Sequence, residues 1–215
     1  MSMDFAVIPA NFSTAEEALK TCEAMYGESG GVPPEPVADL IAELDRMDAI
    51  AEDGGFLSMW PVDAGVHGAI LCTRWPEWDR TIHTLLEMTK VRGLAMVDLQ
   101  QPQVFDPRGC TDVDVTIANG TRLPYLTEQI VVDVMANQRY YGDYIIAGRD
   151  ENNYAQTLYE PGEPCQVEYR AGSPDRHFQT VTSDRSLVPR LIAAWLRDGP
   201  DAQLLQAQQW QRLEF

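Results

Sequence analysis

The fold is decided between Asp143 and Thr182, in the stretch DYIIAGRDENNYAQTLYEPGEPCQVEYRAGSPDRHFQTVT. Short runs rich in β-branched and aromatic residues alternate here with clusters of Gly, Pro, Asn and Asp, a pattern typical of strands joined by tight turns. Connections this short join antiparallel neighbours, so the stretch predicts a four-stranded meander. The predicted strands are Asp143–Gly148, Tyr154–Tyr159, Cys165–Arg170 and His177–Thr182.

Helices are expected on both sides of this meander. Before it, Tyr125–Ala136 has a helical pattern, although its Val-rich centre would also suit a strand. After it, an amphipathic helix is expected to open at Asp184 or Ser186 and to run to Asp198, where a Gly-Pro pair stops it. The second half therefore predicts an α+β domain, an antiparallel four-stranded meander with flanking helices.

The first half predicts a separate small α+β domain. Residues 106–123 are punctuated by Pro and Gly and form the expected boundary, which gives domains at residues 1–108 and 122–215. Hydrophobic periodicity predicts the order strand, helix, helix, strand, strand, helix, strand, strand. The expected strands are Asp4–Pro9, Phe56–Trp60, Val66–Thr73, Leu94–Leu99 and Gln103–Phe105, and the expected helices are Ala15–Met25, Val37–Met47 and Trp78–Lys90.

The chain is strongly acidic, with 33 Asp and Glu against 16 Lys and Arg and a formal net charge of −17. Both halves carry the charge, since residues 1–110 hold 18 acidic and 7 basic side chains and residues 111–215 hold 15 and 9. A field of this sign repels nucleic acid and anionic membranes and speeds encounter with basic partners. We therefore expect a basic protein as partner and exclude nucleic acid and membrane.

Catalytic and metal motifs are weak in this sequence. His67, Cys72, His83 and Cys110 lack the close pairing that zinc sites show, so no metal or other cofactor is expected. The possible Cys165–His177 dyad has no accompanying nucleophile motif. We therefore expect no catalytic residue and no enzyme. The alternative is an enzyme of unknown type that uses a cleft between the halves, with Asp98, Asp106 or His83 in acid–base roles.

Tyrosines and acidic turns in the second half are the best candidates for partner contacts. A tyrosine buries a large area while keeping a polar tip, which suits a binding anchor, although tyrosines are also ordinary strand residues. Two tyrosines five residues apart on one strand face opposite sides, so one of Tyr154 and Tyr159 should point outward. The predicted partner-binding residues are Asp150, Glu151, Tyr154, Tyr159, Glu160 and Glu163.

The order of several short runs in the second half supports a family resemblance. These runs are YGDYII at Tyr141–Ile146, YAQ at Tyr154–Gln156, VEYRAGS at Val167–Ser173 and HF at His177–Phe178, followed by an amphipathic helix, Gly199 and Trp210. In this order the C-terminal half resembles small bacterial immunity proteins of polymorphic toxin systems, notably those paired with deaminase and nuclease toxins. The N-terminal half is similar to uncharacterised bacterial α+β proteins through GLAMVDLQ at Gly93–Gln100, with Leu99 where those proteins have Pro.

The resemblance implies an antidote that binds one cognate secreted toxin and blocks its active site, a toxin acting on nucleic acid or a nucleotide. A cytoplasmic location is expected, because the sequence shows no signal peptide, no apolar run of about 18 residues and four scattered cysteines. The alternative binding role is a non-inhibitory adaptor.

Overall fold

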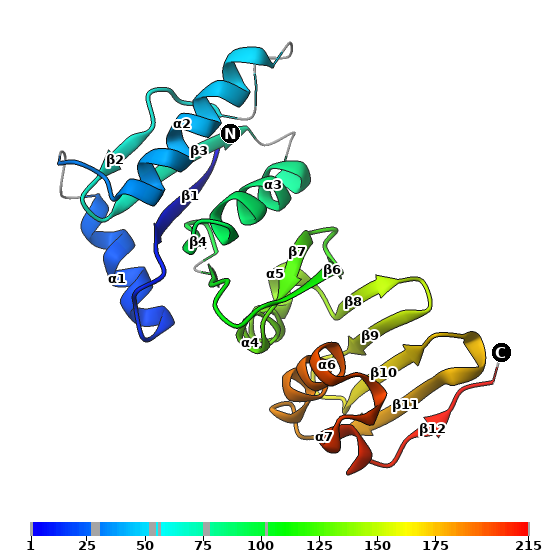
Figure 1. Cartoon of the computed structure of the whole chain (residues 1–215). Helices are drawn as coiled ribbons and strands as arrows, with labels where there is room; N and C mark the ends of the chain where they lie inside the picture. Colours follow the sequence, from blue (N-terminus) through cyan, green and yellow to red (C-terminus); the bar gives the residue numbers. More distant parts are fainter. Residues whose placement is uncertain are drawn as a thin grey trace. The chain divides into compact units, whose positions relative to one another are not determined.

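The computed structural model describes residues 2–26, 31–51, 55, 57–74, 78–101 and 103–214 (Figure 1). The chain divides into two compact units, Met1–Arg108 and Gly109–Phe215. Each unit combines helices with one antiparallel sheet, of five strands in the first unit and seven in the second. The α+β fold class predicted from the sequence is therefore confirmed.

The first unit is built around its first strand. The sheet has the order β2-β3-β1-β4-β5, and β1 pairs antiparallel with both β3 and β4. Its elements are β1 (Ser2–Pro9), α1 (Ala15–Met25), α2 (Glu35–Ile50), β2 (Asp63–Gly65), β3 (Gly68–Arg74), α3 (Trp78–Lys90), β4 (Leu94–Asp98) and β5 (Gln103–Phe105).

One predicted strand of the first unit is wrong. The sequence predicted a strand at Phe56–Trp60, but there Leu57 makes only an isolated bridge to Thr73, and Phe56 lies outside the described residues. On the side of β3 away from β1, the paired strand is β2, which begins at Asp63. The apolar run at residues 57–60 resembled a strand in composition, yet Met59 and Trp60 are about half exposed and join no sheet.

Helices cover both faces of the first sheet. Ala18 and Cys22 of α1 pack on one face, against Ile8, Val97 and neighbouring small residues. The opposite face is equally buried, and α2 and α3 contact its strands. Glu43 of α2 forms an ion pair with Arg92, which lies in the turn after α3. The buried side chains of that face include Phe5, Val7, Leu71, Met96 and Phe105.

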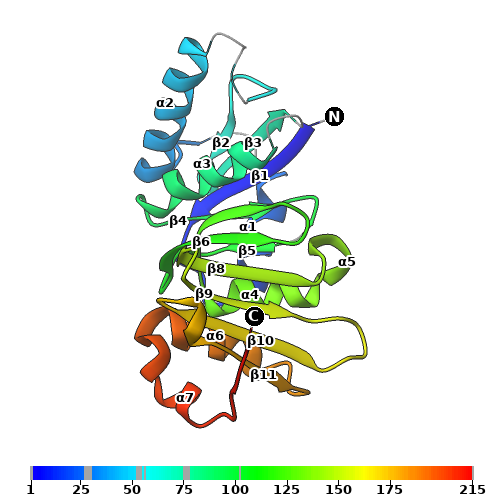
Figure 2. The same cartoon turned by 90° about the vertical axis from the view of Figure 1, so that its right-hand side faces the viewer.

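The second unit holds a larger sheet than the sequence predicted. Its strands lie in the order β12-β11-β10-β9-β8-β6-β7. Figure 2 shows the run from β6 through β8, β9 and β10 to β11. Its elements are β6 (Thr111–Ile117), β7 (Arg122–Leu126), α4 (Glu128–Ala136), α5 (Gln138–Tyr141), β8 (Tyr144–Asp150), β9 (Asn153–Leu158), β10 (Cys165–Ala171), β11 (His177–Thr182), α6 (Leu187–Asp198), α7 (Gln203–Gln206) and β12 (Gln211–Arg212), with single 3₁₀ turns at Pro174–Arg176 and Gly199–Asp201.

The meander of β8 to β11 is present, but the segment expected to be a domain boundary forms strands. β6 and β7 occupy residues 111–126 and extend the sheet from four strands to seven, together with β12. Val113, Val115 and Ile117 are buried and alternate with polar residues, a period of two that the nearby Pro and Gly obscured. The predicted helix at Tyr125 accordingly begins only at Glu128, where the Thr127 side chain accepts the Ile130 N–H.

One face of the second sheet forms the core of the unit. Ile145, Ala155, Val167 and Tyr169 are buried on this face, and α6 packs across β6, β8, β9 and β10. α4 packs against α6. The helices therefore lie on the core side of β8 to β11, and the side chains that alternate with the buried ones point to the other side.

The β2–β3 hairpin requires glycine at its closest approach to β1. A methyl group built at Gly68 would lie 2.1 Å from the carbonyl oxygen of Val7. We expect G68A to lower the free energy of unfolding by about 2 kcal/mol, because the backbone of β1 would have to move. Urea denaturation measures this, and V66A, at a half-exposed position of the same hairpin, should change stability by less than about 0.5 kcal/mol. Equal stability of G68A and the parent would contradict the tight contact.

Candidate functional site

The side chains that point away from the core along β8 to β11 form one surface, which we call the outer face. The register sets Ile146, Gln156, Glu168 and Gln179 beside one another across the four strands. This face is partly apolar: Leu158 is 38% and Val181 is 58% exposed. The outer face consists of Tyr144, Ile146, Tyr154, Gln156, Leu158, Gln166, Glu168, Arg170, His177, Gln179 and Val181.

A buried carboxylate lies at the centre of the outer face. Glu168 of β10 is 7% exposed and accepts hydrogen bonds from side chains on three strands. His177 Nε2 lies 2.9 Å and Gln156 Nε2 lies 2.8 Å from Glu168 Oε2, and Gln166 Nε2 donates to Oε1. Burying a carboxylate is costly unless donors satisfy it, and charge-assisted bonds of this kind are the strong ones. The network therefore ties β9, β10 and β11 together through side chains.

His177 is fixed from both sides of its ring. Nε2 donates to Glu168, and Nδ1 lies 3.4 Å from an Arg170 amino group, which assigns Nδ1 as the acceptor. The Arg170 guanidinium also lies 5.3 Å from the centre of the Tyr154 ring. Because both ring nitrogens are engaged and His177 is 3% exposed, this histidine orders the surface and has no ring nitrogen directed at a substrate.

A pocket of about 280 Å³ opens on the outer face beside Glu168. It lies over the halves of β8, β9 and β10 nearest the β9–β10 turn, as the pairing of Tyr144 with Leu158 and of Leu158 with Gln166 shows. Its lining residues are Tyr144, Ile146, Gln156, Thr157, Leu158, Gln166 and Glu168. The volume is just below the range of about 300 to 1,000 Å³ typical of small-molecule sites.

The acidic residues predicted to bind a partner fall at two separate places. Asp150, the last residue of β8, and Glu151 lie at the β8–β9 connection, whereas Glu160 and Glu163 lie in the β9–β10 turn. The six residues of β9 separate these turns by about 20 Å. Only the β9–β10 turn lies beside the pocket.

Asp150 has a local role in its turn. Its side chain accepts hydrogen bonds from the Asn153 amide group and the Asn152 N–H. These donors lower the pKa of Asp150 below its ordinary value. The Asp150 carboxylate thus closes the β8–β9 turn.

Of the two predicted tyrosines, only Tyr154 lies on the outer face. Tyr159 is fully buried, and its prediction as a contact residue is corrected. Tyr159 follows β9 directly; its N–H donates to the Asp143 carbonyl, and Arg185 lies 5.8 Å from its ring centre. Burial raises the pKa of the Tyr159 hydroxyl. Tyr154 is half-buried and contacts His177 and Arg170.

The Cys165–His177 pair considered from the sequence does not form. In the register of β10 and β11, Cys165 lies opposite Thr182 and His177 lies opposite Arg170. Cys165 points into the core and is fully buried, and burial raises the pKa of its thiol. His177 points to the other face of the sheet, so the two side chains cannot exchange a proton.

The alternative acid–base residues of the first unit have structural partners. Asp106 forms a two-pronged ion pair with Arg108, with contacts of 2.6 to 3.0 Å. His83 is half-exposed, and its Nε2 lies 3.8 Å from Glu87. Asp98 is 1% exposed, and its Oδ1 accepts the backbone N–H groups of Gln100 and Gln101. Asp98 therefore closes the β4–β5 turn, while its buried Oδ2 has no hydrogen-bond donor among the residues that the structure describes.

The cysteines and histidines of the first unit do not assemble into a metal centre. Among the described residues, no group of three or more His, Cys, Asp or Glu side chains is placed to hold a metal ion. No disulfide joins the four cysteines, all of which lie among the described residues. Within the same residues, no helix has the length and apolar character needed to cross a membrane.

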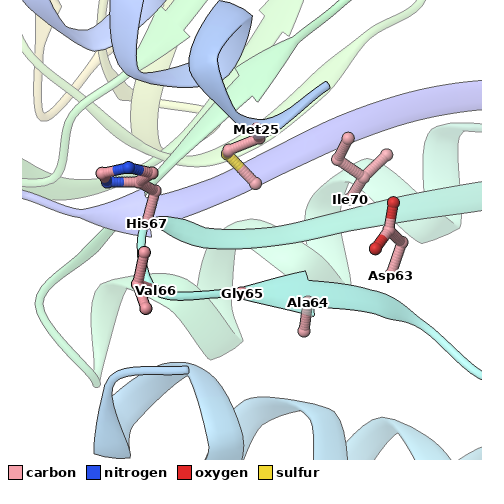
Figure 3. Close-up of a pocket in the computed structure, with 7 residues that line it drawn as sticks. All are labelled: Met25, Asp63, Ala64, Gly65, Val66, His67 and Ile70. Carbon is pink, nitrogen blue, oxygen red and sulfur yellow. The ribbon is translucent and has the colours of Figure 1, made fainter. Parts of the chain in front are cut away.

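The first unit also has a small recess beside the β2–β3 hairpin (Figure 3). Met25 from the end of α1 lies over His67 and Ile70, and Asp63 lies along the hairpin from them. The recess encloses about 10 Å³, which is roughly the space of one water molecule. It is too small for an organic ligand, so the outer face of the second sheet is the better candidate site.

The sequence indicated part of this site. Alternation along β10 placed Gln166, Glu168 and Arg170 on one face, as the structure does. It gave no reason to join them to Gln156 and His177, because only the register of three strands brings these side chains together. Neither a protein-family model, nor a curated protein, nor a solved structure matches the chain. Its function therefore has to follow from its own charge and surface chemistry.

We expect E168A to lower the free energy of unfolding by about 3 kcal/mol, because Gln156, Gln166 and His177 lose their shared acceptor. Urea denaturation followed by circular dichroism gives the value. The matched control is D114A, which removes an exposed carboxylate from β6, a strand of the same sheet outside the network. A loss of stability no larger in E168A than in D114A would show that the network does not hold these strands together.

The free energy of unfolding of the first unit should depend on pH through the buried carboxyl group of Asp98. Burial raises the pKa of Asp98 in the folded chain, so the folded state holds this proton more tightly than the unfolded state. The contribution of Asp98 to stability is therefore largest at low pH and falls as the pH rises through the folded pKa. The amide side chain introduced by D98N keeps the Oδ1 acceptor without the charge, so D98N should gain stability relative to the parent between pH 3 and pH 7.

Asp150 provides a control, because its contribution to stability should change with pH in the opposite direction. Its pKa is lowered in the folded chain, so the parent gains stability from Asp150 as the pH rises, and D150N should lose stability relative to the parent over the same interval. Urea denaturation at several pH values measures both differences. The same pH trend for D98N and D150N would contradict the role assigned to one of these carboxylates.

Proposed function

We propose that the chain is an immunity protein: a cytoplasmic inhibitor that binds one basic protein toxin and blocks its active site. The proposed target acts on nucleic acid or on a nucleotide. The observation that carries the proposal is the outer face of the second unit, a mixed aromatic, aliphatic and polar surface on an acidic chain. The resemblance of the C-terminal half to immunity proteins of polymorphic toxin systems supports the same function.

The charge supports a basic partner. An enzyme that acts on phosphate-bearing substrates has a positively charged active site, and a chain with a net charge of −17 is complementary to it. Such complementarity raises the association rate more than it lowers the dissociation rate, and salt screens it. A toxin must be captured before it reaches its substrate, so a rapid association rate suits an antidote.

The outer face has the composition of a recognition surface. Tyr144 and Tyr154 are half-buried and bring rigid aromatic area. Leu158 and Val181 are exposed apolar residues in the same row of the sheet as Tyr144. Polar side chains between them are held in place by the hydrogen bonds to Glu168. A surface ordered before binding loses little side-chain entropy on binding, which favours tight association.

The acidic β9–β10 turn extends this surface. Glu160 and Glu163 are exposed and lie next in the chain to the pocket strands. They are available to meet basic side chains of a partner that sits on the outer face. The Asp150–Glu151 turn lies about 20 Å away, at the far end of β9, and contributes to the long-range field.

The test is binding and inhibition of the basic toxin encoded beside this gene. We expect a complex whose association rate constant falls as ionic strength rises, and complete loss of toxin activity at a one-to-one ratio. E160Q/E163Q should weaken binding about tenfold. The matched control E23Q/D39N removes the same charge from exposed positions of α1 and α2 and should weaken it less than twofold.

Two results would overturn the proposal. A complex that leaves the toxin fully active would make the chain an adaptor. Equal effects of the two double variants would show that the toxin responds only to net charge and that the outer face is not the contact surface.

A further inference from the structure

The only charge among the residues that line the outer-face pocket is negative. Of its seven lining residues, Glu168 is the charged one, and Gln156 and Gln166 supply the other polar side-chain ends near its carboxylate. Arg170 lies one step further along β10, where its guanidinium contacts the Tyr154 ring and His177. The positive charge of Arg170 is therefore directed toward the neighbouring row of side chains, and the pocket itself presents a carboxylate.

The hydrogen bonds to Glu168 orient the two glutamine amides. Each Nε2 donates to the carboxylate, so each carbonyl oxygen is directed away from it. No donor in the described part of the chain reaches either of these carbonyl oxygens. Glu168 Oε1 accepts one of these bonds and has a second lone pair. The pocket thus presents several hydrogen-bond acceptors close together. A group that carries several hydrogen-bond donors would fit it best.

The remaining walls of the pocket are apolar. Tyr144 and Ile146 of β8 form one side, and Leu158, at the end of β9, is 38% exposed at the rim. A guest that combines an aliphatic stem with a multidentate cationic head matches both parts of this lining. Arginine has this form, because its guanidinium presents five donors in a plane and its methylene stem packs on apolar surface.

We propose that the outer-face pocket receives an arginine side chain of the partner protein, with the guanidinium on Glu168, Gln156 and Gln166 and the stem between Tyr144 and Leu158. The inference rests on the proposed function, because it assigns the anchor of the same protein–protein contact. A pocket of about 280 Å³ accommodates one long side chain, and an arginine seated in a desolvated pocket is a common hot spot of interfaces. A basic partner carries such side chains on its surface.

The pocket can be tested without the toxin. N-acetyl-arginine amide is titrated into the ¹⁵N-labelled chain while the side-chain amide signals of Gln156 and Gln166 are followed. We expect saturable shifts of both signals in the millimolar range. N-acetyl-citrulline amide has nearly the same shape but a neutral urea head, and it should bind at least fivefold more weakly. Equal binding of the two compounds, or no shift with the arginine compound, would overturn the inference.

Two variants make the test specific to the pocket. L158K places an ammonium group at the rim, where the parent side chain is already partly exposed, and should weaken binding of the arginine compound at least tenfold. D114N removes a negative charge from exposed β6 outside the lining and should change binding less than twofold. Unchanged binding to L158K would contradict the assigned site, and circular dichroism confirms that both variants are folded.

Measurements of toxin binding to the parent chain and to L158K distinguish this inference from the proposed function. If the toxin binds the parent chain and binds L158K equally well, the pocket does not hold an arginine anchor, while the immunity function stands. If no toxin binds but the arginine compound does, the function fails and the pocket chemistry stands. Agreement of both measurements, with L158K weakening the toxin at least tenfold, supports the two together.

Discussion

The carboxylate of Glu168 is the constraint on which the binding face depends. A carboxylate with 7% exposure in the middle of a sheet face is stable only if donors surround it, and here they come from β9, β10 and β11. This requirement fixes the rotamers of Gln156 and Gln166, and it holds His177 between Glu168 and Arg170. The position of the apolar side chains around the network then follows from the pleat of the strands. Stability and recognition are thus linked at one residue.

The strong negative charge acts at a longer range than this network. The first unit carries more of it than the second, with 18 acidic side chains against 15, although the outer face belongs to the second. Charge spread over both units attracts a basic protein from a distance, whereas the final fit depends on shape and on the few groups that meet at short range. The acidic β9–β10 turn, with Glu160 and Glu163, contributes to the long-range attraction and also lies beside the contact surface.

Local pattern predicted the meander well, because each strand of β8 to β11 has its own alternation and its own turn residues. The predicted and observed ends of these strands differ by at most two residues. β6 was missed because Pro and Gly around it resemble a linker. The strand at Phe56–Trp60 was predicted from a short hydrophobic segment, although Met59 and Trp60 are half exposed. The site was less accessible to prediction. Tyr159 and Tyr154 have the same chemistry, and only the burial of one by the core distinguishes them. The Glu168 network depends on the register of three strands, which no local pattern encodes.

The claim that the outer face of the second unit binds the partner is tested most directly by hydroxyl-radical footprinting of the chain with and without the toxin. Tyr144, Tyr154 and Leu158 should become protected in the complex. Tyr26, Met59 and Trp60 of the first unit, which are 67%, 51% and 48% exposed, should react as they do in the free chain. Protection of the first-unit residues, with Tyr144, Tyr154 and Leu158 unchanged, would contradict the assignment of the binding face.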